Sequence, residues 1–185
     1  MDFTLKKYRE LCKVINQSSK KNFTIMDYLK NRKENNFVVL RHDVDRSPKN
    51  ALKMAEIEKE NSLKSTYYFR MKTFDREIMD KIKNMGHEIG YHYECLDEAK
   101  GDYKKAIEIF KGNLGKFKDF EVKTICMHGN PLTKWNNRDL WKKYDFREFG
   151  IQGEAYLSVD FSGLEYFTDT NRSWNSKYSI KDKIE

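Results

Sequence analysis

The sequence has little of what defines several special classes of protein. It contains two prolines and nine glycines among 185 residues, which excludes collagen-like chains and chains disordered by Pro and Gly. Its three cysteines are an odd number without C-x-x-C spacing, so we expect reduced thiols and neither a disulfide framework nor a cysteine-built zinc site. Apolar runs such as residues 37–40 fall far short of the roughly 18 residues that a membrane-spanning helix needs.

The charge is basic but scattered. The chain has 36 Lys and Arg against 29 Asp and Glu, a formal net charge of +7. These charges do not form the blocks of like sign that are typical of nucleic-acid-binding segments, so they predict a solvated surface and no nucleic-acid partner. The first twenty residues are charged and interrupted, and they lack the apolar stretch of a secretory signal. We therefore expect a cytoplasmic protein without a membrane span.

The hydrophobic pattern alternates between two periods along a length that suits one domain. We predict helices at residues 5–18, 24–33, 50–60, 74–85, 97–114 and 139–144. Strands are predicted at 37–40, 65–70, 87–92 and 122–127, with two or three further short strands within 146–170 and a polar loop at 41–45. Strands that alternate with helices of this length predict an α/β protein with a parallel sheet, either open or closed into a barrel.

Polar residues gather where the predicted strands end. They are Asp43, Asp45, Arg70, His92, Glu94, His128 and Asn130. All four histidines of the chain, His42, His87, His92 and His128, lie in or beside these segments. In parallel α/β proteins the chemistry gathers at the carboxyl ends of the strands. This edge of the sheet is therefore the predicted functional site.

Asp43 and Asp45 are two residues apart. On an extended backbone their carboxylates point to the same side, while His42 and Val44 point to the other. Two carboxylates this close are unfavourable unless a cation or a proton lies between them. The pair is thus a candidate metal ligand and base. The alternative is a structural role, in which Asp45 caps the helix that begins near Pro48.

The segment H-E-I-G-Y-H at 87–92 contains two histidines five residues apart. The zinc-protease motif needs its histidines four apart on one helical face, so this segment is not such a motif. As a strand it places His87 and His92 on opposite faces, and we expect His92 in the site and His87 in a structural role. His128 is the candidate third ligand, because catalytic zinc commonly takes three protein ligands and a water.

Three segments together resemble a known family. They are R-H-D-V-D at 41–45, S-T-Y-Y-F-R at 65–70 and G-H-E-I-G-Y-H at 86–92. They resemble the polysaccharide deacetylases of the NodB-homology type (carbohydrate esterase family 4), in the branch that carries R-H-D-V-D, and the resemblance runs from about residue 37 to residue 174. It implies a distorted (β/α) barrel over residues 37–185, with residues 1–36 as an N-terminal helical cap. It also implies a divalent metal, expected to be zinc, and hydrolysis of the N-acetyl group of an amino sugar or glycoconjugate.

The resemblance also implies roles for individual residues. Asp43 matches the general base, and Asp45 and His92 match metal ligands. The third ligand is His128 or Glu94, and His128, if it is not a ligand, is the candidate acid that protonates the leaving amine. The expected substrate-binding residues are Arg70, Glu94, Asn130, Asp169, Arg172 and Trp174, and Trp135, Tyr93 and Trp174 are candidates for stacking on a sugar.

The chain departs from the family in several places. Leu96 stands where the family has its second metal histidine, and no histidine follows residue 128 to act as the terminal acid. The family's R-x-P-[YW] motif is absent, so Arg70 or Arg172 is expected to replace its arginine. The match also predicts a barrel that ends one β/α unit early. These departures leave an alternative open: a barrel that has lost catalysis and binds a sugar or a partner protein.

Overall fold

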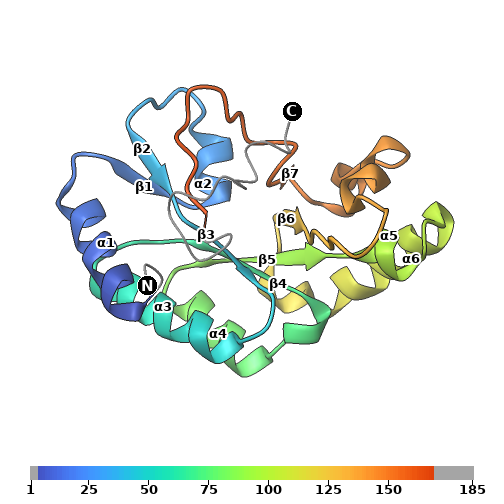
Figure 1. Ribbon diagram of the computed structural model, residues 1–185, viewed down its shortest axis with the longest axis horizontal. Coiled ribbons are helices and arrows are strands. Elements are labelled where there is room, and N and C mark those ends of the chain that lie inside the picture. The colour runs from blue at the N-terminus through green and yellow to red at the C-terminus, as the bar shows by residue number, and fades with distance from the viewer. Residues whose placement is uncertain (1–3, 169–185) are drawn as a thin grey trace.

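The computed structural model describes residues 4–168, in which helices and parallel strands alternate (Figure 1). The strands are β1 (Lys21–Phe23), β2 (Phe37–Val39), β3 (Arg41–Val44), β4 (Thr66–Phe69), β5 (Glu88–Tyr93), β6 (Thr124–Met127) and β7 (Gly153–Glu154). The α-helices are α1 (Leu5–Gln17), α2 (Ile25–Lys30), α3 (Pro48–Glu60), α4 (Arg76–Asn84), α5 (Cys95–Glu98) and α6 (Tyr103–Lys116). Short 3-10 helices are η1 (Met71–Thr73), η2 (Lys118–Phe120), η3 (Asn137–Lys142) and η4 (Phe146–Phe149).

Five of the strands form one parallel sheet in the order β3-β4-β5-β6-β7, and β1 pairs with β2 in a separate two-stranded parallel sheet. The predicted α/β class is therefore confirmed. Helices α3 and α4 lie along one side of the five-stranded sheet, and α2 lies on the other (Figure 1). No helix within residues 4–168 is long and apolar enough to cross a membrane.

The two faces of the five-stranded sheet differ in chemistry because side chains alternate along each strand. The face toward α3 and α4, called the apolar face below, carries Val44, Tyr67, Phe69, Ile89, Tyr91, Tyr93 and Ile125. The opposite face, called the polar face, carries Arg41, Asp43, Tyr68, Gly90, His92, Thr124 and Cys126 at the intervening positions. The apolar face anchors the sheet to α3 and α4, whereas the polar face packs in part against α2 and carries the ionisable side chains of the candidate site.

Several elements differ from the sequence-based prediction. Residues 41–44, predicted as a polar loop, form strand β3, and β1 lies within the segment predicted as a helical cap. The predicted helix 97–114 is interrupted before α6, where Gly101 has a φ of +85° and lies against the Trp135 ring. Of the strands predicted within 146–170, the described part contains only β7. The aromatic residues there, such as Phe146 and Phe149, pack around Phe110 and Trp141 instead of extending the sheet.

Gly90, in the centre of β5, is required by the close approach of a neighbouring ring. A Cβ atom there would overlap the Tyr68 side chain and lie 2.9 Å from the Thr124 carbonyl oxygen. We expect Gly90→Ala to lower the free energy of unfolding by about 1 to 3 kcal/mol, the usual cost of overpacking a core. Chemical denaturation measures this change. The matched control is Gly112→Ala in α6, where a Cβ meets open space and the better helix propensity of Ala predicts a gain of about 1 kcal/mol. A free energy of unfolding for Gly90→Ala that equals or exceeds the wild-type value would contradict the steric argument.

Candidate metal centre

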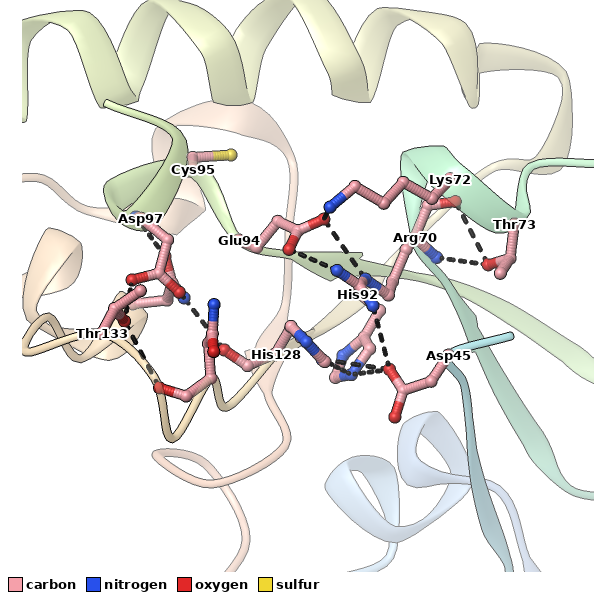
Figure 2. Close-up of polar contacts among 12 residues, drawn as sticks. Asp45, Arg70, Lys72, Thr73, His92, Glu94, Cys95, Asp97, His128 and Thr133 are labelled. Carbon is pink, nitrogen blue, oxygen red and sulfur yellow. Dashed lines mark hydrogen bonds and ion pairs between the residues drawn. The ribbon is translucent and has the colours of Figure 1, made fainter. Parts of the chain in front are cut away.

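Three potential metal ligands meet at the carboxyl ends of the strands. Asp45 directly follows β3, His92 lies near the end of β5, and His128 directly follows β6. Because the strands are parallel, these ends lie at one edge of the sheet. Figure 2 shows both imidazole rings directed at the Asp45 carboxylate. Residues that are far apart in the sequence thus converge on one point.

The three ligand atoms form a compact triangle. Asp45 Oδ1 lies 3.0 Å from His128 Nδ1 and 3.5 Å from His92 Nε2, and the two nitrogens are 3.3 Å apart. Zinc–nitrogen bonds of about 2.0 to 2.1 Å in a tetrahedral site place neighbouring ligands about 3.3 to 3.4 Å apart. The spacing therefore suits a single tetrahedral ion whose fourth position is open.

Hydrogen bonds with the backbone fix the His92 imidazole and the main chain of His128. His92 Nδ1 lies 2.9 Å from the carbonyl oxygen of Cys126, which can only accept, so Nδ1 carries a proton and Nε2 is the nitrogen that faces Asp45. A second interaction of this kind is typical of histidines that bind metals. The His128 amide donates to Tyr93 O (2.8 Å), and its carbonyl accepts from Asn137 Nδ2 (2.9 Å). The His92 ring is therefore oriented by β6, and the backbone of His128 is held by β5 and η3.

The electrostatics of the cluster favour a positive charge. Burial by itself raises the pKa of Asp45, but hydrogen bonds from His128 and His92 hold it well below its usual range. Burial likewise lowers the pKa of His92, yet the carboxylates Asp43 and Asp45 raise it above the ordinary value. Two carboxylates thus surround the buried imidazole. A divalent cation would satisfy both of them in place of the histidine proton.

Asp43 lies beside this triangle with one oxygen fixed and the other free. Its Oδ2 accepts from Arg41 Nη2 at 3.2 Å. Arg41 also donates to the hydroxyl groups of Tyr156 (2.7 Å) and Tyr166 (3.2 Å). Asp43 Oδ1 is buried and has no hydrogen-bond partner among residues 4–168. A buried oxygen without a donor is costly, which is the expected state of a carboxylate that receives a proton from a bound ligand or water.

The two residues predicted as alternative third ligands have different surroundings. His128 is a member of the ligand triangle. Glu94 is buried and receives two hydrogen bonds from the Arg70 guanidinium, with Lys72 Nζ 3.6 Å away. Arg70 Nη1 also lies 3.8 Å from Asp45 Oδ1. Glu94 and Arg70 therefore border the site as an ion pair, and Glu94 is not a ligand in this arrangement.

The remaining predicted residues lie outside the triangle. Asn130 uses its side-chain oxygen to accept from Leu132 N within its own turn (3.1 Å). Tyr93 is fully buried on the apolar face, so it offers no ring face to a sugar. Trp135 packs over Gly101. Asp169, Arg172 and Trp174 lie outside the described residues, and their predicted roles stay predictions.

The four histidines divide into two pairs on opposite faces of the sheet. His92 and His128 belong to the metal cluster, whereas His42 and His87 lie near Glu58 of α3, at 2.6 and 3.5 Å. Glu58 has no exposed surface and also accepts from the hydroxyl groups of Tyr8 and Tyr67. This second polar cluster joins α1 and α3 to the sheet. It is a structural cluster, and it accounts for the predicted structural role of His87.

Sequence analysis did not single out Arg41, Cys126 or Glu58. Arg41 lies on the same strand face as Asp43. The two-residue spacing of Arg41 and Asp43 in the sequence already indicates this. Cys126 lies opposite His92 in the register of β5 and β6, which the sequence does not show. Glu58 follows Ala51 and Ala55 at helical spacing on the buried side of α3. The sequence therefore indicates that Glu58 points inward, but it does not show which residues Glu58 contacts.

No family model, curated protein or solved structure matches this chain. The functional assignment therefore depends on the geometry of the site and on the three sequence segments that meet there.

Proposed function

We propose that this protein is a metal-dependent hydrolase of the polysaccharide deacetylase type, which removes the N-acetyl group from an amino sugar or glycoconjugate. The observation that carries the proposal is the convergence of Asp45, His92 and His128 beside a carboxylate, Asp43, that has a free oxygen. A carboxylate and two imidazoles with an open fourth position are a donor set of catalytic zinc. A bound zinc ion supplies Lewis-acid polarisation of the acetyl carbonyl and activation of water.

The protein's own residues supply the remaining steps. Asp43 Oδ1 takes the proton from the attacking water while Arg41 holds Oδ2 in place. The water oxygen forms a bond to the acetyl carbon, and the carbon–nitrogen bond then breaks. Because His128 lies in the ligand triangle, Asp43 is the group placed to return the proton to the departing amine. The products are acetate and a free amino sugar.

A distorted barrel of the NodB type is part of this proposal. Only Leu40 separates β2 from β3, and its carbonyl accepts from Thr66 N of β4 (3.0 Å). The two parallel sheets are thus joined through one continuous segment. In the proposed arrangement α2 spans the gap between β1 and β7, since Tyr28 accepts from Asp160 N (3.1 Å) and Leu29 lies against Gly153.

Two measurements on the purified protein test the proposal. We expect about one equivalent of zinc and release of acetate from an N-acetylated amino-sugar conjugate. Zinc without acetate release from any such conjugate, together with sugar binding, would favour the alternative of a barrel that has lost catalysis. Absence of a bound divalent metal after reconstitution would contradict both the site and the mechanism.

Replacement of a ligand is expected to remove the metal. Asp45→Ala and His92→Ala each delete one corner of the triangle, and we expect zinc affinity to fall by more than the roughly 10- to 100-fold that loss of an outer-shell partner costs. Competition with a chromophoric chelator measures this change. The matched control is Asp80→Ala on the exposed side of α4, which should bind zinc like the wild type. Unchanged zinc affinity in both site variants would show that the assignment of ligands is wrong.

A further inference from the structure

A second group of potential ligands overlaps the first. Asp43, His92 and Cys126 each present a ligand atom within 4.8 Å of the other two. Cys126 lies opposite His92 in the register of β5 and β6, and both lie on the polar face of the sheet. Asp45 and His128 define what we call the outer position, and Asp43 and Cys126 define the inner position, with His92 common to both.

Two atoms of the inner group have only a long hydrogen-bond contact or none among the described residues. Cys126 is a fully buried free thiol whose sulfur lies 3.8 Å from Asp43 Oδ2. Asp43 Oδ1 is buried without a hydrogen-bond partner in the part of the chain that the structure describes. The Asp43 side chain still keeps 23% of its surface exposed, so an ion can reach this group from solvent.

The donors of the two positions differ in softness. The outer position offers a carboxylate and two imidazoles, whereas the inner position replaces one imidazole by a sulfur. Thiolate ligands select soft metal ions, and carboxylate ligands select hard ones. The inner position is therefore expected to discriminate among cations.

The two positions exclude each other. His92 Nδ1 donates to the Cys126 carbonyl oxygen, which leaves Nε2 as the one nitrogen that can bind an ion. An ion held by Asp43, His92 and Cys126 thus withdraws His92 from the outer position. It also engages the Asp43 carboxylate.

We propose that Asp43, His92 and Cys126 form a second cation position that takes soft, thiophilic divalent ions, and that an ion there displaces one from the outer position. On binding, the sulfur–hydrogen bond breaks, the proton leaves to solvent and a sulfur–metal bond forms, with no change of oxidation state. The inference concerns cation binding alone and does not depend on the deacetylase activity.

Cadmium is the probe for this position, because cadmium thiolates have an ultraviolet charge-transfer absorption that cadmium carboxylates and imidazoles lack. Titration of the metal-free protein with Cd²⁺ is expected to produce this absorption at one equivalent. Cys126→Ala should abolish it and lower Cd²⁺ affinity at least tenfold. Cys12→Ala and Cys95→Ala are matched controls, since both thiols are buried elsewhere, and they should keep the absorption. His128→Ala should also keep it, because His128 belongs only to the outer position.

A ¹¹³Cd NMR spectrum of the wild-type protein tests the proposal without any substitution and decides the matter if Cys126→Ala fails to fold. Coordination by sulfur moves the cadmium resonance far downfield of that for oxygen and nitrogen ligands alone, and the downfield resonance is the expected result. A resonance in the range for oxygen and nitrogen ligands would overturn the proposal. So would a charge-transfer band that survives Cys126→Ala or disappears in either cysteine control.

Discussion

Asp43→Asn is expected to lower kcat for acetate release by about 10²- to 10⁴-fold, the usual contribution of a positioned general base. The amide has nearly the same shape and leaves the outer triangle of Asp45, His92 and His128 intact, but its side chain cannot take a proton from water. Steady-state kinetics measure the loss of activity, and metal analysis should show about the wild-type content of zinc.

The combination of retained metal and lost activity distinguishes a base from a ligand. Asp80→Asn, on the exposed side of α4, is the matched control and should change neither quantity. A reduction of kcat of less than about tenfold in Asp43→Asn would show that another group removes the proton. Loss of zinc in the same variant would instead make Asp43 a ligand of the outer position.

Glu58→Ala is expected to have the largest effect on stability. Glu58 is fully buried and serves as acceptor for Tyr8, Tyr67 and His42. Its removal leaves these polar groups buried without their acceptor, and breaking a buried pair of this kind costs about 3 to 5 kcal/mol. Denaturant unfolding measures the change. Glu56→Ala, an exposed position on the same helix, should lie within about 0.5 kcal/mol of the wild type, and a similar value for Glu58→Ala would contradict the structural role.

The same residue predicts a dependence of stability on pH. Burial alone raises the pKa of Glu58, but His42 and the tyrosine hydroxyls lower it from 4.5 to about 2. A pKa that is depressed in the folded state contributes stability that is fully present above the unfolded-state pKa and is lost as pH falls. The contribution of Glu58 should therefore be complete above about pH 4.5 and disappear toward pH 2. In Glu58→Gln the free energy of unfolding should fall less steeply over this interval, and an unchanged slope would contradict the argument.

Much of the fold follows from the pattern of apolar residues. Helices α1, α3 and α4 were predicted close to their observed bounds, because each buries one stripe at helical spacing. Strand β3 was predicted as a loop because Arg41, His42 and Asp43 are rare in strands. These side chains are tolerated there because Arg41 and Asp43 pair with each other on one face and His42 pairs with Glu58 of α3 on the other. The sequence does not show the contact between His42 and Glu58.

Part of the candidate site was predicted from the spacing of residues along one strand. The two-residue spacing places Asp43 and Asp45 on one side and His42 on the other, and the structure has this arrangement. The choice between His128 and Glu94 required the position of Arg70, which pairs with Glu94 from a neighbouring strand. The involvement of Cys126 required the register of β5 and β6. Sequence spacing thus fixes faces within a strand, whereas contacts between strands need the three-dimensional structure.

The Tyr68 ring that makes Gly90 necessary also lies next to the candidate base. Tyr68 pairs with Asp43 in the register of β3 and β4, is fully buried and bonds to Thr124 across the sheet (2.8 Å). Its ring packs with Ile25, Cys126 and Ala155, so protein atoms fill this side of the sheet next to the candidate base. A ligand of Asp43 would therefore approach from the carboxyl ends of the strands, where Asp45 is exposed.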